Sequence, residues 1–207
     1  MQSVSQRIIR KRKTKDPCVG CGLRHSLCIC EMIPTLILKT KICLVVHRKE
    51  LKRTTNTGAL AIKSLLNSEM RIRGEENKSA LDLSDLLVPS YRTILFFPST
   101  AAVELNQDFV QQSSLPLQLI VPDGNWRQAS KVYSRHPELK NIPQVKISTP
   151  NSSRHHLRAE HSAEGMSTLQ AIACALGIIE GPEVMNKLLA LYHAKLEKTL
   201  LGRGVIL

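Results

Sequence analysis

The segment that decides the fold is the apolar run Leu117-Gln118-Leu119-Ile120-Val121, followed at once by Pro122-Asp123-Gly124-Asn125-Trp126-Arg127. The run has the β-branched, apolar character of a buried strand. Pro122 and Gly124 end it, and residues 126–133 can open a helix behind it. Ligands of open α/β sheets gather just past the carboxyl ends of strands, which is where Asp123 stands. Alternatively, Asp123 only caps the helix and Trp126, the one tryptophan of the chain, fills the core.

The same alternation of strand and helix recurs along the chain. Apolar runs predict further strands at residues 41–47, 93–97 and 144–148. Helical patterns follow at 58–66, from 101 to 105, at 167–175 and from 182 onward. Residues 68–90 have no clear periodicity. This order predicts an α/β fold with a mostly parallel sheet covered by helices.

Four cysteines lie close together near the N-terminus, as Cys18-x-x-Cys21 and Cys28-x-Cys30. In a reducing compartment this spacing favours a tetrahedral zinc site over disulfides, and four protein ligands make such a zinc structural. An iron–sulfur cluster or a redox pair is the alternative, and His25 can replace one thiol. Cys43 and Cys174 stand alone on apolar segments and are expected in the core.

The chain is strongly basic, with 29 Lys and Arg against 17 Asp and Glu and a net charge of +12. This excess favours a polyanionic partner. Arg127, Lys131 and Arg135 recur every four residues, so they would form a stripe on one helix, although a solvated face without a partner has the same pattern. Because aromatic residues are only 3% of the chain, recognition of folded RNA by shape and phosphate contacts is favoured over base stacking.

Length and hydrophobicity predict a cytoplasmic protein with no membrane association. The 207 residues, 43% of them hydrophobic, suffice for a real core. No apolar run approaches the roughly 20 residues that span a bilayer, and the N-terminus lacks the apolar stretch of a signal peptide.

Four blocks of the sequence together resemble the DTW-domain family, the tRNA-uridine aminocarboxypropyltransferases. Asp123-Gly124-Asn125-Trp126 is similar to the family's Asp-x-Thr-Trp signature. The other blocks are the cysteines at 18–30, His47-Arg48-Lys49-Glu50 with Asn56-Thr57-Gly58, and Ser167-Thr168-Leu169-Gln170-Ala171. They span most of the chain in order. The sequence departs from the family pattern at two positions: the family's Thr is Asn125 here, and its acidic residue is Gln170.

The resemblance implies a SPOUT-like fold with a C-terminal trefoil knot that binds S-adenosylmethionine. It implies transfer of the 3-amino-3-carboxypropyl group to N3 of a uridine in tRNA, with release of 5′-methylthioadenosine. A SAM-dependent RNA methyltransferase and a non-catalytic zinc-containing RNA-binding protein are the alternatives. Three domains are expected: a flexible basic tail at 1–16, a Cys-rich zinc-binding module at 17–36 and the DTW catalytic domain at 37–207. A dimer formed through the knot and a monomer that grips RNA with its zinc module both agree with this sequence.

The resemblance also suggests roles for single residues. Asp123 is the candidate general base for the N3 proton, and Trp126 would be one wall of its pocket. The cofactor would lie among Pro98, Ser99, Thr100, Pro122, Asp123, Gly124, Asn125, Ser167, Thr168 and Leu169. Expected RNA contacts are His47, Arg48, Arg127, Lys131, Arg154 and Arg158, with a hydrogen-bonded structural His47 and plain surface arginines as the alternatives.

Overall fold

Six strands form one sheet, all of whose neighbouring strands are parallel, in the order β2-β1-β5-β3-β6-β4. The computed structural model describes residues 14, 16–75, 80–148, 157 and 165–205. The strands are β1 (Lys41–His47), β2 (Ser68–Arg73), β3 (Arg92–Phe96), β4 (Val103–Glu104), β5 (Leu117–Asp123) and β6 (Gln144–Lys146). The prediction of an α/β fold with a parallel sheet is confirmed.

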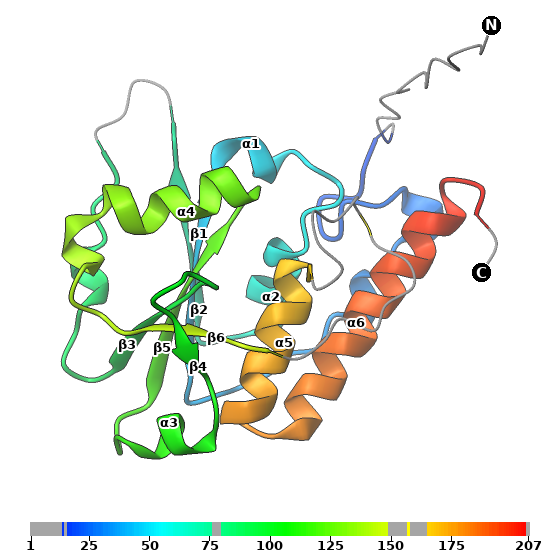
Figure 1. Cartoon of the computed structure of the whole chain (residues 1–207). Helices are drawn as coiled ribbons and strands as arrows, with labels where there is room; N and C mark the ends of the chain where they lie inside the picture. The colour runs from blue at the N-terminus through cyan, green and yellow to red at the C-terminus, as the bar shows by residue number, and fades with distance from the viewer. Residues whose placement is uncertain (1–13, 15, 76–79, 149–156, 158–164, 206–207) are drawn as a thin grey trace, which may run out of the picture.

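Helices cover both faces of this sheet (Figure 1). The α-helices are α1 (Arg48–Leu51), α2 (Gly58–Ser64), α3 (Gln107–Gln111), α4 (Trp126–Arg135), α5 (Thr168–Ile179) and α6 (Pro182–Leu201). Four short 3-10 helices are η1 (His25–Leu27), η2 (Cys30–Met32), η3 (Ser84–Leu86) and η4 (Pro137–Leu139).

The helix predicted from residue 101 is wrong. Val103–Glu104 instead forms β4, which pairs with β6 at the edge of the sheet. The helix begins later, at Gln107, because the side chain of Asn106 accepts a hydrogen bond from the Phe109 amide at 2.8 Å and caps it.

Alternate residues of the central strands enter two different cores. Leu117, Leu119 and Val121 of β5 pack in the core that includes α2, α5 and α6, whereas Ile120 packs with Ala129 and other residues on the α4 side. Figure 1 shows α4 on one side of the sheet and α2, α5 and α6 on the other. Successive side chains of a strand point to opposite faces, and both faces of β5 are covered by a core. For this reason β5 is apolar almost throughout.

The Cys-rich segment shares the larger of these cores. Cys21, Leu23 and Ile29 are buried in the same cluster as Leu196 and Leu200 of α6. Figure 1 accordingly shows the N-terminal described residues beside the C-terminal half of α6. In the part of the chain that the structure describes, no helix is long and apolar enough to cross a membrane.

Candidate functional site

Asp123 ends the central strand β5 and points to the α2 and α5 side of the sheet. This direction follows from the alternation of side chains along the strand, since Leu119 and Val121, four and two residues earlier, face the core on that side. The strand register puts Val46 of β1 beside Asp123, so the carboxyl ends of β1 and β5 lie level. The side chain is buried, with 8% of the residue surface exposed. A carboxylate buried to this degree needs hydrogen-bond partners.

Three distant segments meet at this carboxylate. The Thr168 hydroxyl, at the start of α5, donates to Oδ1 at 2.6 Å. The Asn56 side-chain amide donates to Oδ2 at 3.1 Å. The same two segments are also joined directly, because the Leu169 amide donates to the Thr57 hydroxyl at 3.2 Å. The blocks at 56–58, 123–126 and 167–171, far apart in sequence, therefore form one site.

Gly58 permits this close approach. A Cβ at this position would lie 2.9 Å from Asp123 Oδ2 and 2.9 Å from Leu44 Cδ2, distances that real Cβ atoms do not show. Asn56 is held as well, since its Oδ1 accepts a hydrogen bond from the Ala59 amide at 3.1 Å. The donors that face Asp123 are thus fixed before any substrate binds.

Asp123 is not the cap of the following helix. Asn125 caps α4 instead: its Oδ1 accepts from the Gln128 amide at 2.9 Å, and Gln128 Oε1 accepts from the Asn125 amide at 2.9 Å. The alternative in which Asp123 serves only as a helix cap is wrong. Its carboxylate instead accepts hydrogen bonds from Thr168 and Asn56, which belong to distant segments.

Both departures from the family pattern are helix-capping residues. Asn125 can replace Thr because either side chain offers the required acceptor. Gln170 forms a second capping box with Ser167, in which Gln170 Oε1 accepts from the Ser167 amide at 3.1 Å. An amide oxygen serves there as well as a carboxylate oxygen. The capping roles therefore survive both replacements.

Trp126 lies at the surface and does not fill the core. Its surface is 58% exposed, and its ring packs against Phe97 with 5.1 Å between ring centroids. Phe97 leads into the loop Pro98-Ser99-Thr100 at the same edge of the sheet. Ser99 anchors this loop by donating to Gln144 Oε1 at 2.6 Å. Trp126 is consequently accessible to a planar ligand.

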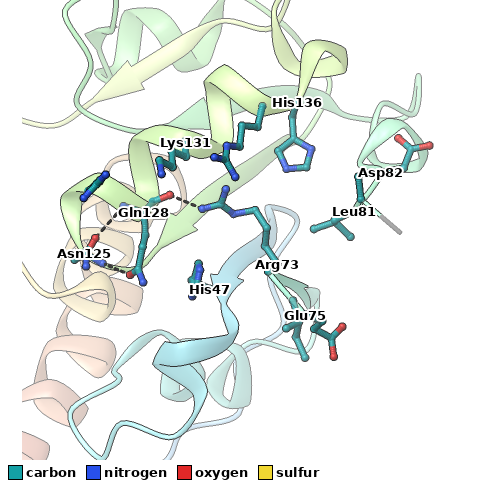
Figure 2. Close-up of a pocket in the computed structure, with 14 residues that line it drawn as sticks. His47, Arg73, Glu75, Leu81, Asp82, Asn125, Gln128, Lys131 and His136 are labelled. Atoms are coloured by element: carbon teal, nitrogen blue, oxygen red, sulfur yellow. Dashed lines mark hydrogen bonds between the residues drawn. The ribbon is translucent and has the colours of Figure 1, made fainter. Parts of the chain in front are cut away.

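A basic pocket opens on the α4 side of the same edge (Figure 2). The cavity has a volume of about 700 Å³. Its basic lining includes Arg127, Lys131 and Arg135 of α4, His47 at the end of β1, and Arg73 at the end of β2. Arg73 was missed from the sequence, because the edge strand that carries it has no apolar run. His136, Gln128 and Asn125 also line the cavity.

His47 presents a neutral ring to this pocket. Its Nδ1 accepts a hydrogen bond from the Lys49 amide at 3.2 Å, and this bond caps α1. Burial lowers the pKa of His47, and the charge of Arg73 lowers it further. A neutral ring with Nδ1 accepting has its proton on Nε2, so His47 can donate a hydrogen bond.

The remaining predicted RNA contacts lie elsewhere. Arg48 is half-buried at the start of α1 and lines a neighbouring hollow with Lys49 and Lys52. Arg154 and Arg158 lie outside the described residues.

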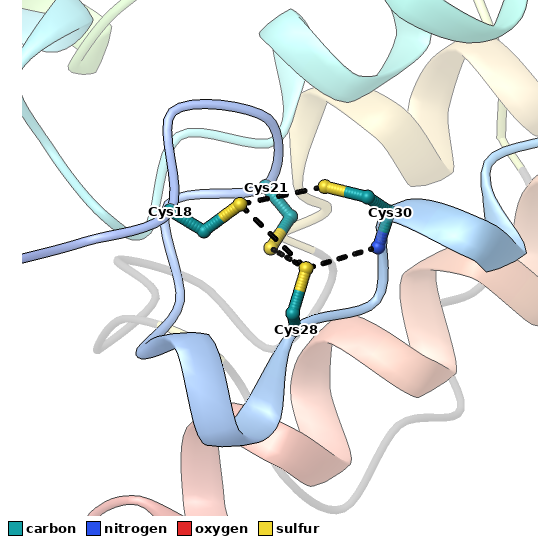
Figure 3. A group of neighbouring side chains, drawn as sticks. All are labelled: Cys18, Cys21, Cys28 and Cys30. Carbon is teal, nitrogen blue, oxygen red and sulfur yellow. Dashed lines mark hydrogen bonds between the residues drawn. The ribbon is translucent and has the colours of Figure 1, made fainter.

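The four N-terminal cysteines form one cluster (Figure 3). Their sulfurs lie within 4.8 Å of one another, with Cys18 to Cys30 at 3.5 Å, Cys18 to Cys28 at 3.6 Å and Cys21 to Cys28 at 3.8 Å. Sulfurs at the corners of a tetrahedron with zinc–sulfur bonds of about 2.3 Å lie about 3.8 Å apart. The cluster thus has the size that a zinc ion requires.

The surroundings of the cluster favour a bound cation. Backbone N–H groups of Cys21 and Gly20 lower the pKa of Cys18 to about 6. Burial raises the pKa of Cys30 to about 12, and the neighbouring thiols push it the same way. The charge of a bound cation would relieve the repulsion among four thiolates. A Cβ on Gly20 would lie 2.3 Å from Cys30 Sγ, so only glycine fits at this turn.

Two lysines donate to the backbone around these thiols. The Lys195 ammonium, fully buried on α6, donates to the Cys21 carbonyl at 2.5 Å. The Lys63 ammonium donates to the Gly20 carbonyl at 2.5 Å and to that of Val19 at 3.1 Å. Burial lowers the pKa of Lys195 to about 8, while the nearby cysteines oppose this shift. A zinc ion with four thiolates has a net charge of about −2, which two ammonium groups would balance.

Sequence comparisons find one matching family and several similar proteins. The DTW domain family matches residues 15–200. A protein of Macaca fascicularis named tRNA-uridine aminocarboxypropyltransferase 2 is 24% identical over 177 residues, which cover 83% of this chain and 59% of the relative. The Drosophila melanogaster protein of the same name is 27% identical over 186 residues, covering 86% of this chain and 73% of the relative.

A plant protein is similar to the same extent. The tRNA-uridine aminocarboxypropyltransferase A of Arabidopsis thaliana is 26% identical over 202 residues, covering 84% of this chain and 76% of the relative. No solved structure matches the chain significantly. The chain spans less than two thirds of the macaque relative's length.

Proposed function

The chain belongs to the DTW domain family, and from that premise we propose that it transfers the 3-amino-3-carboxypropyl group of S-adenosylmethionine to N3 of a uridine in tRNA. One observation supports this most strongly: three segments that match the family converge on the buried carboxylate of Asp123. Three relatives have names that describe aminocarboxypropyl transfer to a uridine of tRNA.

Asp123 is the general base in this proposal. The N3 proton of uridine passes to a carboxylate oxygen, and N3 forms a bond to the arm carbon next to the sulfonium. The carbon–sulfur bond breaks and its electron pair stays on sulfur, which gives 5′-methylthioadenosine. Because the sulfonium is already an activated leaving group, positioning of the two substrates contributes more to the rate than acid–base help does.

The donor would be held by three loops at the carboxyl edge of the sheet. These loops are Pro98-Ser99-Thr100 after β3, Pro122-Asp123-Gly124-Asn125 at the end of β5, and Ser167-Thr168-Leu169 at the start of α5. Ligands of parallel sheets bind at this edge, which supports the assignment. A trefoil knot in the C-terminal part, as in SPOUT proteins, belongs to the same proposal. Trp126 is exposed and would cover one planar group of a substrate.

The polyanionic partner in the proposal is tRNA. The net charge of +12 and the basic pocket beside Asn125 both support it. His47, Arg48, Arg127 and Lys131 would be phosphate or sugar contacts.

Cys18, Cys21, Cys28 and Cys30 would hold a zinc ion. When bound, this ion supplies only structural cross-linking, because four thiolates leave no open position for a substrate. The residues themselves fix the N-terminal segment against α6 through the Cys21 carbonyl and the Lys195 ammonium.

Incubation with unmodified tRNA and S-adenosylmethionine tests the function. Mass spectrometry then identifies both the small by-product and the altered nucleoside. We expect 5′-methylthioadenosine and an aminocarboxypropyl uridine. S-adenosylhomocysteine with a methylated base would make the protein a methyltransferase, and no turnover with any tRNA would favour a binding protein.

A further inference from the structure

Four cationic side chains converge on the basic pocket without an acidic partner. Arg127, Lys131 and Arg135 lie on one face of α4, and Arg73 reaches the same cavity from β2. Among the described residues, no ion pair joins any of the four to a carboxylate. Arg71 of β2 and Lys41 of β1, by contrast, are paired with acidic residues. The pocket therefore concentrates positive charge that the fold does not neutralise there.

The two acidic residues that line the cavity do not neutralise this charge. Asp82 accepts hydrogen bonds from the Ser84 amide and hydroxyl, both at 2.9 Å. Glu75 lies at the far rim, and Figure 2 draws its carboxyl group pointing away from Arg73. Electrostatic repulsion among the cations is accordingly strong. The charges of Arg135 and Arg127 lower the pKa of Lys131. Burial lowers the pKa of Arg73, and Arg135 adds to the effect.

Arg73 is fixed in a geometry that leaves donors unused. Its Nη2 donates to the Gln128 carbonyl at 2.6 Å, which ties the guanidinium to α4 (Figure 2). Its Nε is buried and has no hydrogen-bond partner among the described residues. A planar guanidinium held in this way favours oxyanions, which accept two of its N–H groups at once.

The pocket lies on the opposite face of the sheet from Asp123 but at the same edge. Val46 of β1 pairs with Asp123, and the next residue, His47, pairs with Arg73 of β2. Two strand spacings and one residue step separate the Cα atoms of Asp123 and Arg73, a distance of about 10 Å. A nucleotide splayed out of its stack can extend over such a distance.

We propose that this pocket binds phosphate, and that in the working enzyme the phosphate belongs to the RNA backbone next to the modified uridine. Arg73, Lys131 and Arg135 provide the charge, and His47 provides a neutral N–H donor. The assignment to RNA rests on the proposed function. The binding of phosphate itself does not, because it follows from the charge and geometry of the cavity.

The salt dependence of tRNA binding tests the proposal in the full chain. Each phosphate contact contributes about 0.7–0.9 to the slope of log affinity against log salt concentration. The double variant Lys131→Gln/Arg135→Gln should bind tRNA more weakly, with a slope reduced by about 1.5. Lys187→Gln/Lys198→Gln removes the same charge from α6, on the other side of the sheet, and should keep the slope of the unmodified protein. Equal slopes for the two double variants would overturn the assignment of this phosphate to the RNA backbone.

Two further measurements separate the sources of phosphate and isolate Arg73. Inorganic pyrophosphate should compete with tRNA for the unmodified protein and lose this effect in the Lys131/Arg135 variant. If the variant loses pyrophosphate binding but keeps its tRNA slope, the pocket serves a free phosphate compound, and the RNA assignment is wrong.

Arg73→Lys retains the charge but loses the planar fork, so tRNA affinity should fall several-fold with an unchanged melting temperature. Unchanged affinity would remove Arg73 from the site. None of these measurements needs turnover, so they stand whichever group the enzyme transfers.

Discussion

The Thr168 hydroxyl donates a short hydrogen bond to Oδ1 of Asp123, at 2.6 Å. Thr168→Val keeps the shape of the side chain but leaves this buried carboxylate oxygen without that donor. We expect the free energy of unfolding to fall by about 1–3 kcal/mol and kcat to fall with it. Urea denaturation and turnover assays measure the two effects. Thr35→Val, at an exposed position, is the matched control; equal behaviour of the two variants would show that the Thr168 bond contributes nothing.

Lys195 is the residue that connects α6 to the cysteine cluster. Lys195→Met retains the length of the buried side chain but removes the ammonium that donates to Cys21. Groups next to a metal's ligands typically account for 10–100-fold in affinity, so zinc should be lost to a competing chelator at about 10–100-fold lower chelator concentration. The control is Lys198→Met on the same helix. Undiminished zinc affinity in Lys195→Met would mean that the ammonium does not balance the charge of the cluster.

Helix α4 connects the site on one face of the sheet to the pocket on the other. Its capping residue, Asn125, differs from the family pattern. Because the cap needs only a side-chain acceptor, Asn125→Thr should change the unfolding free energy by less than about 0.5 kcal/mol, whereas Asn125→Ala should lower it by about 0.5–2 kcal/mol. Urea denaturation of the two variants compares these effects directly. A Thr variant as unstable as the Ala variant would contradict the capping role.

The elements that were predicted correctly have strong local patterns. The apolar runs of β1, β3 and β5 are visible because these strands are buried on both faces. Edge strand β2 was missed because all six of its residues are half-buried and no apolar run marks it. Strand β4 has two residues, which is too short for any periodicity.

Contacts between segments distant in sequence could not be predicted from local patterns. The sequence pointed to Asp123, Asn56 and Thr168 separately, through blocks that resemble one family. Their hydrogen bonds depend on the order of strands and on where α5 docks, which no spacing along the chain encodes. Arg73 belongs to the same class, since it meets Lys131 and Arg135 only because β2 lies beside β1.

At the scale of the whole molecule, the cysteine cluster and the sheet share one hydrophobic core. Leu23 and Ile29 pack in the cluster that includes α5 and α6. Removal of zinc with a chelator should therefore lower the melting temperature of the entire chain in one transition, because metal binding and folding are coupled. Calorimetry with and without chelator tests this. Two separate transitions, or no shift in a protein shown to have bound zinc, would mean that the segment folds independently of the sheet.

The carboxyl edge of the sheet brings together every feature on which the proposed reaction depends. Asp123 and its donors lie on one face, the cationic pocket lies on the other, and Trp126 is exposed between the ends of β3 and β5. A substrate that uses both faces must extend over this edge. A polyanion with an unstacked base can extend over the edge in this way, with its base on one face and its phosphate on the other.

The kinetics of Asp123→Asn test the central claim most directly. The Asn side chain fits the same space, and its amide can donate to the Thr168 hydroxyl, so the fold and the tRNA affinity should remain. We predict that kcat for aminocarboxypropyl transfer falls by about 100-fold or more, because no base remains to take the N3 proton. Asp108→Asn, an exposed acid on α3, is the control for lost charge. Unchanged kcat in a folded Asp123→Asn variant would contradict the assignment of Asp123 as the base.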